Sequence, residues 1–130
     1  MRVLIADDEK GVGETLANLV SHCRHEVVEV VGSGVEAIRA YNQHHPDVVI
    51  MDYWMSNLNG ATACRNILAR NPSAQVILVS GWTPVTDLSK AGAVAVLTKP
   101  VDPMDLEHLL NSLVQQPALD FGLPETSPQV

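Results

Sequence analysis

Short, uninterrupted apolar runs recur along most of this chain, and stretches with helical spacing separate them. Such runs are typical of strands that are buried on both faces of a parallel sheet. They lie at residues 3–6, 48–51, 76–79 and 94–97, and residues 26–31 supply a further strand. Parallel neighbours need crossover connections, and these are right-handed. The alternation therefore predicts a doubly wound α/β sheet.

The stretches between the runs place apolar residues three or four positions apart, as on one face of a helix. The pattern is clearest near the C-terminus, where we expect a stripe of core leucines at positions 106, 109, 110 and 113. A chain of 130 residues normally has one hydrophobic core. We therefore expect one domain over residues 1–116. Residues 117–130 contain three prolines and little periodicity, which predicts a flexible tail or the start of a linker.

Composition limits the partners and the compartment of the chain. Fifteen acidic residues against eight basic ones give a net charge of −7, which opposes nucleic-acid binding by this chain. No apolar run approaches the roughly 20 residues needed to span a bilayer. The N-terminus lacks the features of a secretory signal. We therefore expect a cytoplasmic protein that binds neither nucleic acid nor membrane.

The two cysteines, Cys23 and Cys64, lack a CxxC spacing, and each falls in an apolar helical pattern. Free buried thiols are therefore expected in place of a disulfide. Cys23 lies between His22 and His25, but that spacing matches no common zinc pattern. We expect surface and core roles for these three residues.

Polar residues stand at the carboxyl ends of four predicted strands. Asp7 and Asp8 follow the first strand, and Asp52, Ser80 and Lys99 close the third, fourth and fifth. In open α/β sheets, ligands bind beyond these strand ends. We therefore expect the five side chains to lie close together.

Three carboxylates at one edge of a sheet would raise one another's pKa unless a cation compensated them, and oxygen ligands favour Mg²⁺. The Lys99 ammonium and the metal would neutralise an incoming phosphoryl group. The Asp52 carboxylate could then act as nucleophile, with a hydrogen bond from Ser80 to a phosphoryl oxygen. Taken singly, these residues have simpler roles, because an acidic pair complements a helix dipole and Asp52 could be a solvated turn residue.

In combination, these motifs resemble the receiver domain of two-component response regulators over nearly all of residues 1–116. The matching elements are Asp7-Asp8-Glu9, Asp52 with Met55 and Gly60 after it, Ser80-Gly81 and Lys99-Pro100. The resemblance implies a flavodoxin-like, five-stranded parallel sheet of order 2-1-3-4-5 with five helices. It also implies a phosphoacceptor signalling domain that catalyses only its own phosphorylation and dephosphorylation.

The resemblance further assigns roles to single residues. Asp52 would take a phosphoryl group from a sensor histidine kinase or phosphotransfer protein in a Mg²⁺-dependent reaction, and a downstream protein or a missing output domain would read the change. The metal ligands would be Asp7, Asp8, Asp52 and the main-chain carbonyl of Trp54. Ser80 and Lys99 would contact the phosphoryl group. The peptide bond between Lys99 and Pro100 would be cis, as is typical of the family.

The sequence departs from the family at several positions. Ser56 replaces the usual proline four residues after the acceptor, and Val96 replaces the aromatic switch residue. The 19 positions from Ser80 to Lys99 are about three fewer than usual, nearly one helical turn. Residues 85–91, between a proline and a glycine, are therefore expected to form a fourth helix of at most about two turns.

Trp54 and Trp82 lie two positions beyond Asp52 and Ser80, where side chains of this fold flank the phosphoryl group. Our hypothesis is that the indoles restrict the attacking water and lengthen the life of the phosphorylated state. The alternative is that both are packing residues.

Three alternative interpretations remain open, two of them other functions and one a different extent of the protein. A dehalogenase-like phosphohydrolase also uses a strand-end aspartate, but it usually needs a second aspartate where Trp54 stands. A flavodoxin-like cofactor binder would suffer repulsion between the flavin phosphate and Asp7, Asp8 and Glu9. The chain could also be the receiver fragment of a longer regulator or hybrid kinase.

Overall fold

The computed structural model describes residues 1–81 and 91–120, with side chains up to residue 114. Trp82 and nearly all of the expected fourth helix lie outside these residues. Within these residues, no helix has both the length and the apolar character that crossing a bilayer requires.

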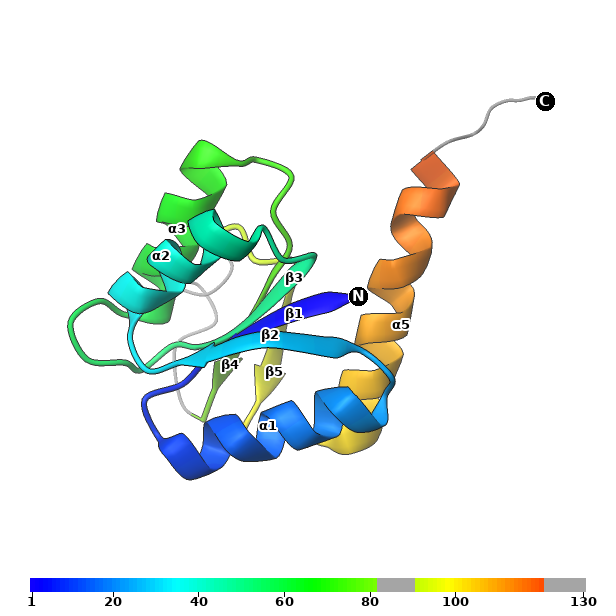
Figure 1. The fold of residues 1–130 in the computed structure, drawn as a ribbon, viewed down its shortest axis with the longest axis horizontal. Coiled ribbons are helices and arrows are strands. Elements are labelled where there is room, and N and C mark those ends of the chain that lie inside the picture. Colours follow the sequence, from blue (N-terminus) through cyan, green and yellow to red (C-terminus); the bar gives the residue numbers. More distant parts are fainter. Residues whose placement is uncertain (82–90, 121–130) are drawn as a thin grey trace.

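Five parallel strands form one sheet in the order β2-β1-β3-β4-β5, as the resemblance implied (Figure 1). The strands are β1 (Arg2–Ala6), β2 (Glu26–Val31), β3 (Val48–Asp52), β4 (Val76–Ser80) and β5 (Ala95–Thr98). The last strand starts one residue later than the apolar run predicted. Its register pairs Thr98 with Ser80, so backbone pairing continues past the end of the apolar run.

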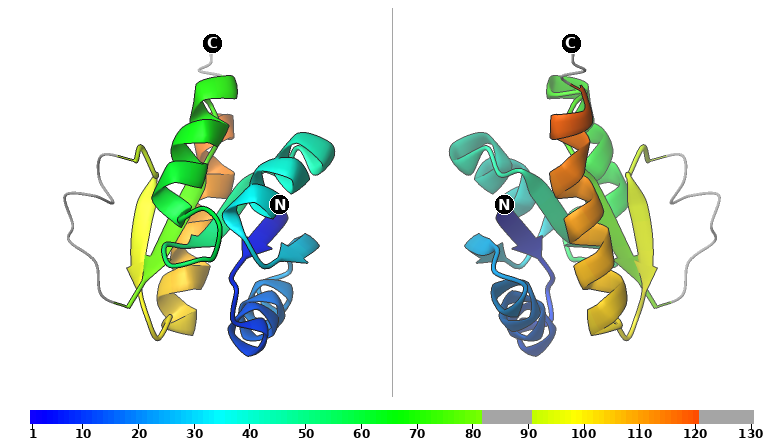
Figure 2. Two further views of the ribbon diagram at one scale, coloured as in Figure 1. Left: turned by 90° about the vertical axis from the view of Figure 1, so that its left-hand side faces the viewer. Right: turned by 90° about the vertical axis from the view of Figure 1, so that its right-hand side faces the viewer.

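Among the described residues, two helices lie on each face of the sheet (Figures 1 and 2). The helices α1 (Lys10–His22) and α5 (Pro103–Asp120) lie on one face, and α2 (Gly34–His44) and α3 (Gly60–Arg70) lie on the other. Two core clusters result, one on each side of the sheet. This double-sided burial explains why the central strands have apolar residues at consecutive positions.

The core confirms most of the predicted apolar pattern. Every residue of β3 and β4 is buried, whereas the edge strands β2 and β5 are partly exposed. In the leucine stripe of α5, Leu106, Leu110 and Leu113 are buried and Leu109 is partly buried. The stripe is therefore part of the core, as expected, and it packs on the α1 side of the sheet.

The helix α5 extends farther than the sequence analysis placed the end of the domain. It continues through Pro117 to Asp120, although Pro117 and the loss of periodicity suggested a tail from that position. A proline therefore did not end this helix. The role of the remaining residues stays a prediction.

The two thiols differ in burial. Cys64 is fully buried in α3, where its Sγ lies 3.4 Å from the carbonyl oxygen of Ala91, and burial raises its pKa to about 11. Cys23 caps the end of α1 and is only partly buried, so the prediction of a buried thiol was wrong there. Both thiols are free.

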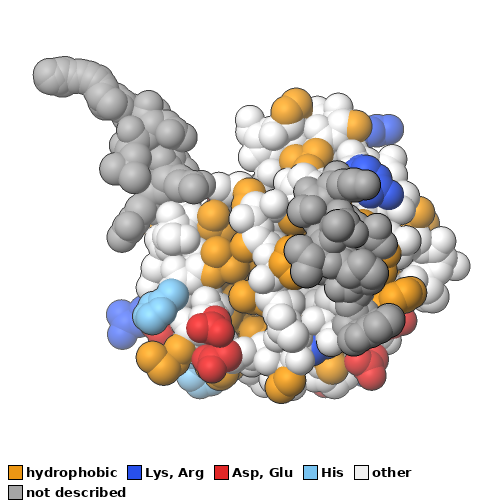
Figure 3. Space-filling model, turned by 180° about the vertical axis from the view of Figure 1, so that it is seen from behind, with side chains coloured by type: hydrophobic (Ala, Val, Ile, Leu, Met, Phe, Trp, Pro, Cys, Tyr) orange, Lys and Arg blue, Asp and Glu red, His pale blue; other side chains and the backbone are white. Residues whose placement is uncertain are grey.

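Some apolar side chains remain on the surface, and Figure 3 shows hydrophobic groups on the face seen from behind. Large exposed hydrophobic residues on or next to β5 and on α5 are Val94, Val96, Met104 and Val114. Val96, at the position of the family's aromatic switch, has an exposed fraction of 42%. Its side chain therefore lies at the outer surface of the sheet edge.

Candidate functional site

Three aspartates meet where β1 and β3 end. The two strands are paired with Ala6 opposite Met51, so the residues that follow, Asp7 and Asp52, lie side by side. Carboxylate oxygens of Asp7, Asp8 and Asp52 all lie within 4.8 Å of one another. Asp7 and Asp52 are buried and Asp8 is exposed. The tertiary structure thus confirms that the predicted acidic residues come together.

Lys99 reaches this cluster from the end of β5. Its Nζ lies 3.2 Å from an Oδ2 of Asp7 and 3.2 Å from an Oδ2 of Asp52. The main-chain N–H of Lys99 donates to the Ser80 carbonyl at 3.1 Å. The peptide bond between Lys99 and Pro100 is cis, as expected. One ammonium group therefore contacts both buried carboxylates.

Burial and neighbouring charge both change the ionisation of this pair. Burial raises the pKa of Asp52, and the Asp7 carboxylate raises it further, while hydrogen bonding and charge from Lys99 and the N–H of Trp54 partly oppose the rise. Burial by itself lowers the pKa of Lys99, but the carboxylates of Asp52 and Asp7 outweigh it and the net direction is upward. The site therefore favours a protonated Lys99 and gains from additional positive charge near Asp52.

Backbone contacts fix the first acidic loop. The N–H of Asp7 donates to the Val31 carbonyl at 3.0 Å, and Oδ1 of Asp7 accepts the N–H of Glu9 at 2.9 Å. The exposed carboxylate of Glu9 also lies 3.8 Å from Lys99 Nζ. Asp7 is thus held from β2 on one side and from its own loop on the other.

A close backbone approach fixes the loop after Asp52. The N–H of Gly60, the first residue of α3, donates to the Tyr53 carbonyl at 2.8 Å. A Cβ at Gly60 would lie only 2.2 Å from the main-chain oxygen of Asp52. The side chain of Asn59 caps α3 by accepting the N–H of Thr62 at 2.9 Å. Only glycine at position 60 lets the start of α3 pack this tightly against the end of β3.

A pocket of about 610 Å³ lies over the acidic cluster. Its lining residues are Asp8, Glu9, Asp52, Trp54, Gly81 and Lys99. The Trp54 ring meets Tyr53 edge to face, with centroids 4.9 Å apart and planes at 81°, and Trp54 has an exposed fraction of 58%. The pocket is therefore lined by carboxylate residues, one lysine and one tryptophan.

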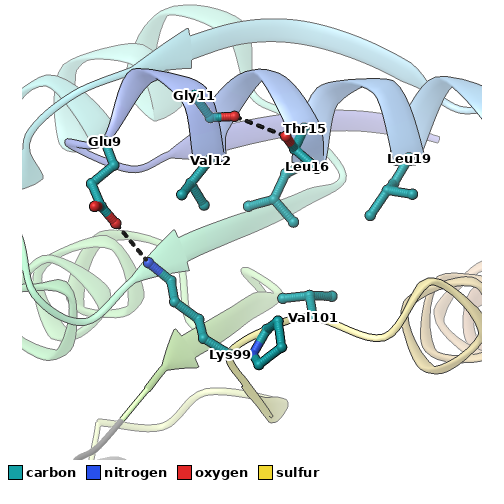
Figure 4. A pocket seen from close by; sticks show the side chains of 9 residues that line it. Glu9, Gly11, Val12, Thr15, Leu16, Leu19, Lys99 and Val101 are labelled. Carbon is teal, nitrogen blue, oxygen red and sulfur yellow. Dashed lines mark hydrogen bonds and ion pairs between the residues drawn. The ribbon is translucent and has the colours of Figure 1, made fainter.

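An apolar groove of about 660 Å³ adjoins this pocket along α1 (Figure 4). Glu9 and Lys99 line both the groove and the pocket. The remaining groove residues come from α1 and the segment after β5, and they are Gly11, Val12, Thr15, Leu16, Leu19, Pro100 and Val101. A continuous surface therefore connects Asp52 with the apolar side of α1.

The structure places most of the predicted site residues at this strand-end edge. Ser80 is the buried last residue of β4, next in the sheet to the strand that carries Asp52. Trp82 lies outside the described residues. Glu9 and Gly81 were not among the predicted site residues, although Glu9 lies near Lys99 and Gly81 lines the pocket. Their membership of the acidic and Ser-Gly motifs was the available signal.

The donor set fits a hard divalent cation. Among the described residues, the three aspartates form the one cluster of His, Cys, Asp or Glu side chains with metal-ligand spacing. All three are carboxylates, which suit Mg²⁺, and two of them are buried. The geometry is thus compatible with the metal that the sequence predicted.

The fold and the site together define the class of the protein. A model of the response regulator receiver domain family matches residues 3–111. The chain therefore belongs to this family and is a signalling domain of two-component phosphorelay systems.

Two relatives show how the similarity extends. The chain is 32% identical over 115 residues to the chemotaxis protein CheY of Thermotoga maritima, covering 86% of this chain and 96% of CheY. It is 36% identical over 107 residues to the transcriptional regulatory protein PdtaR of Mycobacterium tuberculosis, covering 81% of this chain and 52% of PdtaR. The similarity thus includes both a nearly full-length match and part of a longer regulator.

Solved structures agree with this assignment. A response regulator receiver domain protein from Clostridium thermocellum superposes with a TM-score of 0.84 at 28% identity, covering 91% of this chain and 97% of that chain. CheY of Borrelia burgdorferi, solved in a CheX-CheY-BeF3-Mg complex, superposes with a TM-score of 0.77 at 25% identity, covering 91% and 89%.

Proposed function

We propose that Asp52 is the phosphoryl acceptor of this receiver domain, and that Asp7, Asp8, Asp52 and the Trp54 carbonyl hold Mg²⁺ while Ser80 and Lys99 contact the phosphoryl group. The observation that carries the proposal is the buried Asp52 carboxylate, whose Oδ2 lies 3.2 Å from Lys99 Nζ. The same Nζ lies 3.2 Å from Oδ2 of Asp7. A sensor histidine kinase or phosphotransfer protein supplies the phosphoryl group, and a downstream protein target or an output domain reads the modified state.

The residues of the chain divide the chemistry between them. An Asp52 carboxylate oxygen attacks phosphorus, and the bond between phosphorus and the donor breaks on the opposite side. Lys99 stabilises the charge of the transferring group, because its pKa is raised and it stays protonated. The Ser80 hydroxyl donates to a phosphoryl oxygen. A Mg²⁺ ion held by the aspartates supplies further charge neutralisation.

The Borrelia burgdorferi neighbour supports the metal assignment, since that CheY was solved with Mg²⁺ and BeF3. The two tryptophans of this chain provide a direct test. Titration with Mg²⁺, then with beryllofluoride as a phosphoryl mimic, should change the tryptophan fluorescence in two steps, because Trp54 lines the pocket. An unresponsive emission after both additions, or an equal response in Asp52→Asn, would contradict the assignment.

The same site argues against an enzyme that turns over a substrate. The position two residues after Asp52 is Trp54, where a phosphohydrolase of the dehalogenase type needs a second aspartate as acid and base. We therefore propose that the chain catalyses only its own phosphorylation and dephosphorylation. Steady hydrolysis of a phosphomonoester, in amounts far above that of the protein, would contradict this.

We assign the groove along α1 to the partner that carries the phosphohistidine. That partner must bring phosphorus to Asp52, and the groove is continuous with the pocket through Glu9 and Lys99. Its wall is largely apolar, with Val12 and Leu19 partly buried, so an apolar helix face of the partner fits it.

Placing a charge in the groove should therefore slow transfer from a protein donor. Val12→Glu should slow phosphoryl transfer from a phosphorylated histidine kinase domain, since a buried charge costs binding energy. This fall should be about tenfold larger than any fall in the rate of phosphorylation by acetyl phosphate. The matched control is Val35→Glu, an exposed valine on α2 at the other face of the sheet. An equal effect of both substitutions on transfer would reject the groove.

Trp54 should also set how long the phosphoryl group survives. Trp54 lines the pocket around Asp52, and hydrolysis needs an in-line approach of water to phosphorus. Trp54→Asn should therefore shorten the phosphoryl lifetime on the order of tenfold, because access and orientation govern the rate. Decay of the phosphorylated protein after removal of the donor measures this, and equal lifetimes would refute the role.

A further inference from the structure

Trp54 is the one aromatic residue among the described residues that line the Asp52 pocket. Its ring contacts Tyr53 edge to face, and Tyr53 is itself 9% exposed and packed in the core. Trp54 nevertheless keeps an exposed fraction of 58%. Trp54 therefore lines the pocket, its ring is held against Tyr53, and more than half of its surface is exposed to solvent.

The stereochemistry of phosphoryl transfer places the leaving group in the same region. The attacking oxygen of Asp52 and the leaving group must lie on opposite sides of phosphorus. Asp52 is buried, so the leaving group is on the solvent side of phosphorus, within the pocket that Trp54 helps to line. When the donor is a phosphohistidine, that leaving group is an imidazole, a flat aromatic ring that can stack on an indole.

We propose that Trp54 is a specificity-determining residue, whose indole stacks on the imidazole of the donor and makes the domain favour phosphohistidine-type donors over donors with an aliphatic leaving group. This inference rests on Asp52 being the acceptor. In the step, an oxygen of Asp52 bonds to phosphorus as the N–P bond breaks. The leaving nitrogen keeps the electron pair of that bond, and the ring departs as neutral imidazole because its other nitrogen already carries a proton.

Two small donors separate stacking from general access. Phosphoimidazole carries the aromatic leaving group, and acetyl phosphate carries an aliphatic one. The ratio of the two initial phosphorylation rates, measured with excess Mg²⁺ on the full chain, reports the preference. Any change in the acceptor, in Lys99 or in metal binding affects both donors and largely cancels in the ratio.

Two substitutions at Trp54 distinguish an aromatic face from mere bulk. Trp54→Leu keeps an apolar side chain but has no ring, and it should lower the rate ratio of phosphoimidazole to acetyl phosphate by about tenfold, equivalent to about 1.4 kcal/mol. Trp54→Phe keeps a ring and should hold the ratio within about twofold of wild type. The main-chain carbonyl and N–H of residue 54 are present in all three proteins.

The control is Met104→Leu, a change at an exposed apolar residue of α5 that does not line the pocket. Its ratio should equal that of wild type, and matching urea unfolding midpoints should show that all variants fold. An unchanged ratio in Trp54→Leu, or equal falls in the Leu and Phe variants, would overturn stacking. Failure of the proposed function would give a different result. In that case neither donor would phosphorylate the wild type, or both donors would still label Asp52→Asn.

Discussion

Replacing Asp52 by asparagine should lower phosphoryl incorporation from either a kinase or acetyl phosphate by at least about a hundredfold, because an amide oxygen is a poor nucleophile and forms no stable acylphosphate. The measurement is stoichiometric labelling with a radioactive phosphoryl donor in the presence of Mg²⁺. Undiminished labelling would place the acceptor elsewhere.

The variant should remain folded, which makes a loss of labelling interpretable. Burial and the Asp7 carboxylate raise the pKa of Asp52, so the ionised carboxylate weakens the fold as the pH rises through that pKa. A neutral asparagine removes this effect. Without Mg²⁺ at neutral pH, Asp52→Asn should therefore unfold at the same or a higher urea concentration than wild type.

Asp47→Asn is the matched control. Asp47 directly precedes β3 at its opposite end, and its Oδ2 accepts the N–H of Arg2 at 2.7 Å, a contact that an asparagine oxygen preserves. This variant should be labelled as wild type is. Mg²⁺ should also stabilise Asp47→Asn as much as wild type but stabilise Asp52→Asn less, because only the latter loses a proposed metal ligand.

The second large effect should come from Gly60→Ala, which we expect to lower the free energy of unfolding by about 1–3 kcal/mol. The new Cβ would meet the Asp52 oxygen at 2.2 Å and the Tyr53 Cα at 3.0 Å, and both are backbone atoms that cannot move aside as a side chain can. Either α3 or the end of β3 must shift, so phosphoryl transfer should also slow. Urea unfolding and acetyl phosphate labelling measure the two effects.

A second glycine tests whether the effect is specific to this approach. Gly11 lies in α1, and nothing lies within 4 Å of the position of its Cβ. Gly11→Ala should therefore raise the unfolding free energy by about 0.5–1 kcal/mol, since alanine favours the helix. A Gly60→Ala protein as stable as wild type would show that the chain relieves the clash at little cost.

Much of the architecture was predictable from local pattern. The apolar runs at β3 and β4 identified strands covered on both faces, and the polar residue that ends each one marked the functional edge. Leu106 and Leu110 likewise marked the buried side of α5. The end of α5 was not predictable in the same way, because Pro117 stops many helices and does not stop this one.

Sequence by itself determined the fold class and which polar residues stand at the strand ends, because burial imposes a periodicity that each segment carries in its own residues. Tertiary structure alone decided the contacts between segments. It brings Lys99 within 3.2 Å of Asp7, from the opposite end of the sequence, and sets the carbonyl of Asp52 against Gly60. It also forms the groove between α1 and the segment after β5. Such distances depend on how strands are ordered and helices packed, which no single segment of the chain specifies.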